Sequence, residues 1–353
     1  MKNREKKSFL VLALCILHIN MLSAGEVVCT SDSGDDKSYM LTYFRQRYAG
    51  RVEITAEGKV VQVPLPEPMD VERLHIALSD DGLHWTALND NEPVWEQQMR
   101  DPYVRRSPDG VWRLLATGGG RRPDRDQSGP SCLYATSEDL ITWKVEGLLP
   151  LMKDVRNEKG EMVRNIWAPE WFYDEKEDNY LLVWSSSFED AGWKKSRLWY
   201  CRTKDWKTFT PAKILFNPGY SVIDGTILEY EKKYYLFHKE EEFGERTGER
   251  RAIRVAVSDS LEGPYAIIDG PLNGGQIVPV ITEGPSAVMS KDGSCWFLYY
   301  DYCMTNRFGV SVSADLLNWN IVEDASFPFE ARHGTVSVIT AGEAEKLRKA
   351  YGN

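Results

Sequence analysis

The sequence predicts an all-β protein folded as a five-bladed β-propeller, with the last blade closed by N-terminal strands and a short helix at the C-terminus. Two observations carry this prediction. Short runs of aromatic and β-branched residues alternate with turns rich in Gly, Asp and Asn, a pattern typical of β-strands. One turn motif also recurs five times at comparable intervals. A repeated unit of several short strands is typical of a propeller blade.

The recurring turn consists of Ser or Thr, then Asp, then an apolar residue and usually an aromatic residue. Each copy directly follows a strand-like run, and most are preceded by a second such run, for example over residues 112–116. The five copies span residues 79–85, 137–143, 203–209, 258–265 and 313–319.

The strands at the two ends of the chain predict how the ring closes. Four complete units run from Asp101 to about Val322, and only one strand, over residues 332–340, follows them. Two strands, over residues 39–44 and 74–78, precede them without an inner strand. Joining these pieces gives a fifth blade and leaves no inner edge unpaired. The alternative, an open β-sandwich, would not need five matching turns. Residues 341–350 are expected to form the C-terminal helix.

Residues 1–24 have the features of a signal peptide. Basic residues within positions 2–7 precede an apolar run over 9–21, and Leu22-Ser23-Ala24 offers small residues for cleavage. The apolar run is shorter than the ~20 residues of a membrane span. A transmembrane anchor and a lipid anchor at Cys29 are the alternatives. We therefore expect a single propeller over residues 25–353 in a secreted or periplasmic protein.

The composition of the chain limits the classes of molecule that it is expected to bind. The net charge of −10 disfavours nucleic acid, because an acidic surface repels phosphate groups. The aromatic share of 12% supplies ring faces that can stack on sugars. No CxxC pair or Cys/His metal spacing occurs, and most cysteines lie in strand-like runs, so we expect them to be buried as small hydrophobic residues. The sequence does not predict the oligomeric state.

A short motif with a titratable side chain opens the first strand of each unit. The intervals between these side chains are 69, 54, 59 and 50 residues, which predicts that they share one phase of the repeat. Because the innermost strands of a propeller line its channel, four carboxyl groups and one imidazole are expected to converge at one mouth. The motifs contain Asp101, Glu170, Asp224, Glu283 and His333.

Converging carboxyl groups have two common uses, which are holding a cation and general acid–base catalysis. Glycoside hydrolysis needs one protonated carboxyl group to release the leaving oxygen and one carboxylate to activate water. A neighbouring carboxylate can raise the pKa of the acid and keep it protonated. The pattern therefore fits a cation site or an acid–base catalyst such as a glycoside hydrolase.

The motifs Asp-Pro, Trp-Ala-Pro-Glu, Ile-Asp-Gly, Glu-Gly-Pro and Arg-His-Gly-Thr, in this order and one per blade, resemble those of glycoside hydrolase family 43. The resemblance covers essentially the whole mature chain. It implies an inverting hydrolase of plant polysaccharides that contain arabinose, xylose or galactose. It also implies that Asp101 is the general base, Asp224 the modulator of pKa and orientation, and Glu283 the general acid. The pair Asp224-Gly225 departs from the Asp-Pro of many members.

Five further residues are candidate substrate contacts, and each has a structural alternative. A carboxylate can pair with an arginine instead of a sugar, a tryptophan can pack in the core, an arginine can neutralise the acids, and a histidine can be satisfied internally. The resemblance also makes His333 a candidate ligand for a structural Ca²⁺ in the channel, although the reaction requires no cofactor. The candidate contacts are Glu170, Trp167, Arg307, Arg332 and His333.

Within the family, we expect an exo-acting α-L-arabinofuranosidase that acts on the side chains of an oligo- or polysaccharide. A β-xylosidase and a β-galactofuranosidase are the alternatives. A retaining fructan or sucrose hydrolase shares the Arg100-Asp101-Pro102 triplet, but the chain lacks the early Asn-Asp-Pro-Asn segment of that group and has Glu283-Gly284 in place of Glu-Cys. A propeller that binds glycans without cleaving them is an alternative of a different class.

Overall fold

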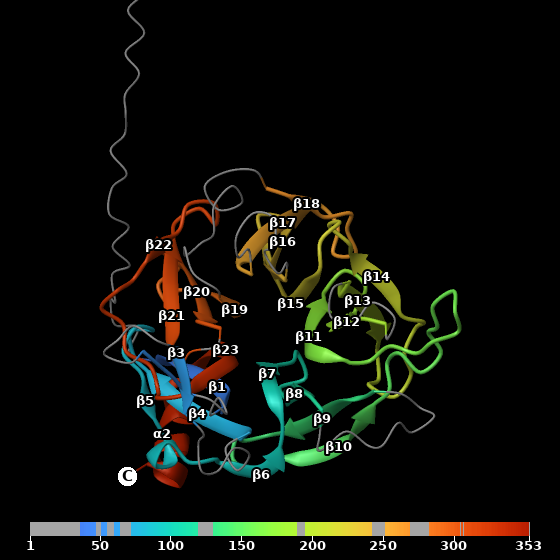
Figure 1. Cartoon of the computed structure of the whole chain (residues 1–353). Coiled ribbons are helices and arrows are strands. Elements are labelled where there is room, and N and C mark those ends of the chain that lie inside the picture. Colours follow the sequence, from blue (N-terminus) through green and yellow to red (C-terminus); the bar gives the residue numbers. More distant parts are fainter. Residues whose placement is uncertain are drawn as a thin grey trace, which may run out of the picture.

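The computed structural model describes residues 36–46, 51–54, 60–63, 72–118, 130–188, 195–241, 251–268, 282–303, 305 and 307–352. The predicted signal peptide over residues 1–24 lies outside these ranges. Five antiparallel sheets surround a common centre, which confirms the five-bladed propeller (Figure 1). The innermost strands are β7, β11, β15, β19 and β23.

Blades one to four each contain four strands that follow the chain from the centre outward. Blade one contains β7 (Arg100–Arg106), β8 (Trp112–Thr117), β9 (Cys132–Ser137) and β10 (Lys144–Leu149). Blade two contains β11 (Trp167–Asp174), β12 (Asn179–Ser186), β13 (Arg197–Thr203) and β14 (Lys213–Phe216). Blade three contains β15 (Val222–Tyr230), β16 (Lys233–Glu240), β17 (Ile253–Ser258) and β18 (Ala266–Ile267). Blade four contains β19 (Glu283–Met289), β20 (Trp296–Asp301), β21 (Phe308–Ser313) and β22 (Asn320–Ile321).

The fifth blade joins the two ends of the described chain, as the sequence predicts. The C-terminal strand β23 pairs antiparallel with β1, and β1 pairs with β4. In Figure 1, β1 in blue therefore lies beside β23 in red. The blade contains β23 (Ala331–Thr340), β1 (Lys37–Arg45), β4 (Arg73–Ser79) and β5 (Thr86–Ala87), and β6 (Trp95–Gln98) pairs with β4 after the 3-10 turn η1 (Asn89–Asn91).

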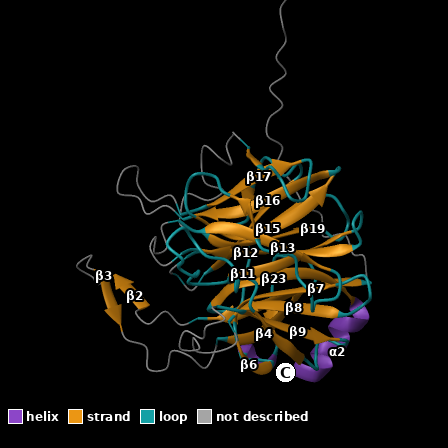
Figure 2. Ribbon diagram, turned by 90° about the vertical axis from the view of Figure 1, so that its right-hand side faces the viewer, coloured by secondary structure: helices purple, strands orange, loops and turns teal. Residues whose placement is uncertain are grey.

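Two smaller elements lie outside the blades. The predicted C-terminal helix is α2 (Ala341–Tyr351), which begins with a capping box between Thr340 and Glu343 and packs against β1 and β23. Strands β2 (Arg51–Ile54) and β3 (Val60–Val63) form a hairpin that projects from the propeller in Figure 2. Within the described part of the chain, no helix is long and apolar enough to cross a membrane.

Hydrogen bonds explain the recurring turn. In blade one, the Asp139 carboxylate accepts the backbone N–H groups of Ile141 and Thr142, and the Ser137 hydroxyl accepts that of Leu140. Asp and Ser favour such turns because their short side chains can reach nearby backbone groups. The aromatic residue that follows, Trp143, donates its ring N–H back to the carbonyl of Leu140 at 3.2 Å. The motif therefore ends one strand and holds its aromatic ring in place.

The core consists of apolar clusters between neighbouring blades, because each sheet buries both of its faces. Trp171 packs in one such cluster with Tyr134 and Trp206, which lie in two different blades. The described cysteines are buried, as predicted. Cys132, Cys201 and Cys303 are free, and Cys295 is disulfide-bonded.

Candidate active site

Each innermost strand carries a β-bulge close to its first residue. The ladder pairing skips one position there, so that two residues of the inner strand oppose one residue of its neighbour. A bulge bends the strand and re-aims a side chain, which is why bulges are common beside active sites. It also removes a ladder bond, so proline is tolerated at its second position. The bulged pairs are Asp101-Pro102, Ala168-Pro169, Asp224-Gly225, Gly284-Pro285 and His333-Gly334.

The bulges place residues in a backbone conformation that few side chains adopt. Asp101, Ala168 and Asp224 have φ values of 50°, 43° and 52°, in the left-handed region. Asp tolerates this region better than most residues because its short side chain can bond locally. Gly284 has a φ of 63°, and a Cβ atom there would lie 2.6 Å from Cγ of the His333 ring. The bulge of blade four thus needs glycine for both reasons.

The shared register corrects the predicted phase of the repeat. The first bulge position is occupied by Asp101, Ala168, Asp224, Gly284 and His333. Glu283 therefore lies one residue before this position, and Glu170 lies two residues after it, opposite Val183. The prediction that all four acids share one phase was wrong for these two. The intervals between motifs vary too widely to reveal a difference of one or two residues.

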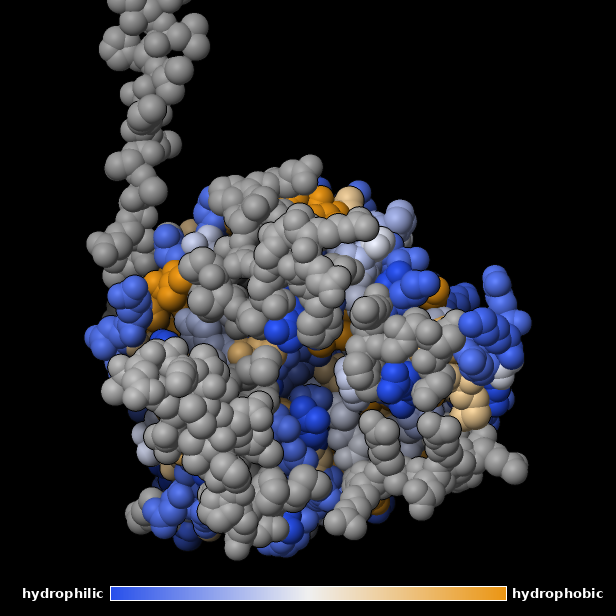
Figure 3. Space-filling model, in the orientation of Figure 1, coloured by the Kyte–Doolittle hydropathy of each residue, from blue (hydrophilic) through white to orange (hydrophobic). Residues whose placement is uncertain are grey.

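Three of the predicted residues meet directly at the bulges. Nδ1 of His333 lies 3.5 Å from Oδ1 of Asp101 and 3.8 Å from Oδ2 of Asp224. The same oxygen of Asp224 accepts the backbone N–H of Gly284 at 3.2 Å, which places Asp224 beside Glu283. In the view of Figure 3, a hollow with hydrophilic residues lies at the centre of the ring.

A second set of residues, here called the bridging residues, links the blades at this level. Each is the last or the last but one residue of the strand next to an inner strand, opposite the residue that precedes the bulge. Each also contacts the inner strand of the following blade. Thr117 accepts the N–H of Ala168, and Ser185 accepts that of Asp224. The bridging residues are Thr117, Ser185, Lys239, Asp301 and Phe44.

Ion pairs occupy both carboxylate oxygens of Glu283. Oε2 lies 2.6 Å from Nζ of Lys239 in blade three, and Oε1 pairs with Nη2 of Arg332 in blade five. Arg332 also donates from Nε to Asp301 at 3.0 Å. Although burial acts to raise the pKa of Glu283, the charges of Lys239 and Arg332 outweigh it and hold that pKa well below its usual range. Glu283 is therefore a carboxylate in this arrangement.

The pKa of Asp224 shifts in the opposite direction. Burial raises the pKa of Asp224, whereas His333 and Lys239 lower it and the charge of Glu283 raises it, with a net result of about 7. Burial lowers the pKa of His333, but the carboxylates of Asp224 and Asp101 outweigh burial and raise it. Asp224 therefore keeps a proton to higher pH than an ordinary aspartate, and the pKa of His333 lies above that of an ordinary histidine.

These residues form a buried acidic group fit for proton transfer, and the comparison with known families agrees. Residues 66–345 match the family model of a probable glycosyl hydrolase domain, which is related to glycosyl hydrolase family 43. The chain belongs to this family. It is a glycoside hydrolase, and its substrate is a carbohydrate. No protein with a curated description matches the sequence.

Several solved structures are similar to this hydrolase. The endo-arabinase from Bacteroides thetaiotaomicron is 17% identical, with a TM-score of 0.48 over 67% of this chain and 83% of its own. The α-L-arabinofuranosidase from Lactobacillus brevis is 17% identical, with a TM-score of 0.45 over 64% and 72%. A family 117 glycoside hydrolase from Zobellia galactanivorans is 16% identical, with a TM-score of 0.47 over 68% and 83%. At these TM-scores, none of them indicates the sugar that this hydrolase cleaves.

The predicted substrate contacts of the hydrolase occupy different places. Glu170 is 7% exposed, and burial raises its pKa to about 8 against the opposing effects of Thr226 and His333. Trp167 is partly exposed and precedes the bulge of β11. Arg332 pairs with Glu283, in agreement with the alternative that an arginine neutralises the acids. Arg307 is exposed in the turn after β20, where its guanidinium lies 4.9 Å from the centre of the Tyr302 ring.

Sequence reasoning missed several residues of the site. Lys239, Asp301 and Thr117 lie at or next to the ends of strands that are mostly apolar or aromatic. The charge or hydroxyl near a strand end was the available signal. Gln46 and Glu72 flank the strands β1 and β4 of the fifth blade. Gln46 accepts from Arg332 at 3.0 Å and donates to Glu72 at 3.1 Å, which extends the polar network.

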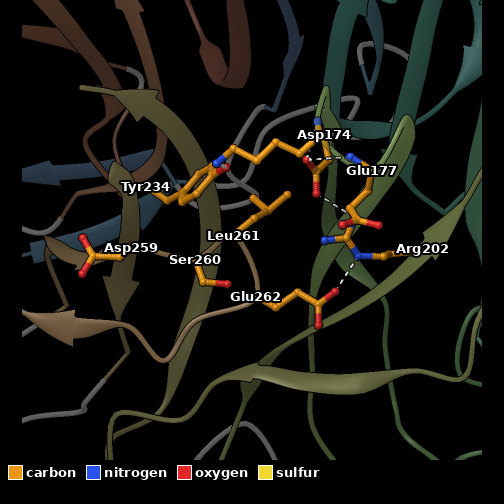
Figure 4. A pocket seen from close by; sticks show the side chains of 9 residues that line it. Asp174, Glu177, Arg202, Tyr234, Asp259, Ser260, Leu261 and Glu262 are labelled. Carbon is orange, nitrogen blue, oxygen red and sulfur yellow. Dashed lines mark hydrogen bonds and ion pairs between the residues drawn. The ribbon is translucent and has the colours of Figure 1, made fainter. Parts of the chain in front are cut away.

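A polar depression of about 510 Å³ lies between blades two and three, at the other end of β11 from the bulge. Figure 4 shows Arg202 beside the acidic side chains of Asp174 and Glu262. Arg202 donates to Asp174 at 2.9 Å and to Glu262 at 2.5 Å, so the main charges are already paired. We assign no function to it. Among the described residues, no group of three His, Cys, Asp or Glu side chains could hold a metal ion. The Ca²⁺ at His333 stays a prediction.

Proposed function

We propose that this hydrolase cleaves a terminal glycosidic bond with inversion, at the centre of the ring where the five bulges meet. Asp101 is the general base, Glu283 the general acid, and Asp224 the modulator between them. The observation that carries the proposal is the pair of contacts from Nδ1 of His333 to Asp101 and Asp224. These contacts bring together acids that lie far apart in the sequence.

The proposed reaction divides the proton transfers between two carboxyl groups. Asp101 accepts a proton from water as the water oxygen bonds to the anomeric carbon. Glu283 donates a proton to the leaving oxygen as the glycosidic bond breaks. An inverting enzyme needs base and acid roughly 6.5–9.5 Å apart, so that the water fits between base and sugar. The hydroxyl of Thr117 donates to Oδ2 of Asp101 at 2.5 Å, which supports the orientation of the base.

For the substrate, we propose a terminal α-L-arabinofuranosyl residue on a plant-type polysaccharide, with β-xylosides and β-galactofuranosides as the next candidates. The support is the motif resemblance to family 43, whose members act mostly on these sugars. The family match supports the class of reaction and leaves the sugar to experiment.

We also propose that the hydrolase acts outside the cytoplasm, in the periplasm or beyond the cell. The signal-like residues 1–24 support export. The disulfide bond at Cys295 supports an oxidising compartment, because such bonds are rare where cellular thiols stay reduced.

The test is a panel of p-nitrophenyl glycosides carrying α-L-arabinofuranose, β-xylose or β-galactofuranose, followed by plant oligosaccharides with product identification. We expect release of one sugar and a loss of about 10²–10⁴-fold in Asp101→Asn, the usual worth of a general base. Asp259→Asn, at an exposed position in the turn after β17, is the matched control and should keep full activity. Full activity in Asp101→Asn would remove the base assignment.

A further inference from the structure

Lys239 is a buried cation directed at the proposed acid. It lies near the end of β16, and its side chain is 1% exposed. Nζ lies 2.6 Å from Glu283 and 2.9 Å from Glu241, and it donates to Sγ of Cys303 at 3.8 Å. An uncompensated buried charge is costly, so this lysine depends on its carboxylate partners. Its position ties blade three to the first residue of β19 in blade four.

The fold does not require a lysine here. At the equivalent positions of blades one and two, Thr117 and Ser185 make the link to the next blade by accepting one backbone N–H each. Among the five bridging residues, Lys239 alone carries a positive charge. It contacts a side chain of the proposed machinery instead of the backbone. A neutral hydrogen-bonding side chain would satisfy the same structural need.

We propose that Lys239 is a positioning residue for Glu283. Together with Arg332 it holds both carboxylate oxygens, so that the free enzyme keeps Glu283 as a carboxylate. This inference rests on the proposed function, because it assumes that Glu283 is the donor.

The surroundings support this distribution of charge. Two cations contact Glu283, and their charges outweigh the effect of burial and hold its pKa well below its usual range. Asp301, also buried and beside Glu283, has a pKa raised to about 6. The charged and titratable groups facing Glu283 or Asp224 are Lys239, Arg332, His333, Asp101, Glu170, Glu241, Asp301 and Cys303.

The protons balance over one turnover. When substrate binds, Glu283 takes up one proton from solvent and donates it to the glycosidic oxygen as the bond between that oxygen and the anomeric carbon breaks. Asp101 takes one proton from the attacking water, whose remaining hydroxyl stays on the sugar. Asp101 then releases its proton to solvent. No net proton is consumed.

The direct test is a titration of the Glu283 carboxyl carbon by NMR in protein labelled with ¹³C-glutamate. The Glu283→Gln variant identifies the resonance, and the measurement needs no substrate. We expect Glu283 in the wild type to stay ionised well below pH 4.5, its usual pKa. In Lys239→Met the midpoint should rise by about 1–3 pH units, the usual effect of losing an opposite charge. Lys239→Arg should restore the wild-type midpoint.

Lys176→Met is the matched control, because this lysine bonds to Tyr234 at the other end of the blades. It should leave the Glu283 midpoint unchanged. A wild-type midpoint at or above 4.5 would overturn the proposal, and the wild-type titration decides this even if Lys239→Met does not fold. An unchanged midpoint in folded Lys239→Met would overturn it as well.

An activity measurement separates this inference from the proposed function. The fall of kcat/KM with rising pH should move to higher pH in Lys239→Met and return in Lys239→Arg. If Lys239 is only structural, Lys239→Met should lower Tm and leave the pH at which kcat/KM falls unchanged. That result would contradict the proposal. Failure to cleave any glycoside would refute the proposed function instead, while the NMR titration would still report the charge state of Glu283.

Discussion

The hydroxyl of Thr117 donates a hydrogen bond of 2.5 Å to Oδ2 of Asp101 and accepts the backbone N–H of Ala168 at 2.8 Å. One side chain therefore orients the proposed base and joins blade one to blade two. Near the bulges, the same contacts that join neighbouring blades also orient the proposed catalytic side chains.

Replacing Thr117 by Val should affect catalysis and stability together. Val has nearly the same shape but can neither donate to Asp101 nor accept from Ala168. We expect kcat/KM to fall by about 10-fold or more, since the base loses its fixed orientation, and the free energy of unfolding to fall by about 1–2 kcal/mol. Thr117→Ser keeps the hydroxyl and is the control. Equal activity in Thr117→Val and Thr117→Ser, measured by aryl glycoside hydrolysis, would show that this bond does not orient the base.

The role of Glu283 predicts a dependence on the leaving group. A good leaving group departs without a proton, so Glu283→Gln should retain most activity on a dinitrophenyl glycoside and lose about 10²–10⁴-fold on an alkyl glycoside or oligosaccharide. Steady-state kinetics on the series gives the ratio. Asp101→Asn is the comparison, because the base is needed for every leaving group. A uniform loss across the series in Glu283→Gln would contradict the assignment.

The raised pKa of buried Glu170 predicts that replacing it by Gln stabilises the fold, and by more at high pH. Its pKa rises from a usual 4.5 to about 8 in the fold, so between these values the folded protein holds a proton that the unfolded chain has lost. Stability contributed by this position therefore falls as pH rises. Glu170→Gln is neutral throughout and should raise Tm little at pH 4.5 and by roughly 5 °C at pH 8. Exposed Glu158→Gln is the control, and a gain in Glu170→Gln that is independent of pH would disprove the explanation.

The close packing of Gly284 against His333 predicts that a side chain at this position destabilises the fold by more than the backbone conformation alone would. Gly284→Ala places a methyl group in the left-handed region and against the His333 ring. Gly293→Ala has the same backbone problem, with a φ of 73°, but its nearest neighbour is Sδ of Met289 at 3.8 Å. We expect about 1–2 kcal/mol of destabilisation for Gly293→Ala, and a larger loss together with reduced kcat/KM for Gly284→Ala. Equal losses in both, by thermal denaturation, would mean that the His333 contact is unimportant.

The fold could be predicted from the strand-like runs and the repeated turn. Asp139 of the turn in blade one hydrogen-bonds to residues within three positions of itself, so this turn can be recognised from the local sequence. The closure of blade five followed from counting strands. The acids Asp101, Asp224 and Glu283 were found because each lies in a short motif at the start of an inner strand.

The remaining features depend on pairing across strands. Lys239 reaches Glu283 from 44 positions earlier in the chain, and nothing in the apolar run before it indicates that distant partner. The one-residue offset of Glu283 and the two-residue offset of Glu170 become visible only through the ladder register. Ion pairing of Glu283 follows from the register and could not be predicted from its own motif.

The measurement that tests the account most directly is ¹H NMR of the first sugar released from an aryl α-L-arabinofuranoside, or from the best substrate of the panel, before the product anomers equilibrate. The account predicts that the wild type releases the inverted anomer first and that Asp101→Asn releases almost none. Release of the retained anomer, or turnover undiminished in Asp101→Asn, would contradict the proposed division of work between Asp101 and Glu283.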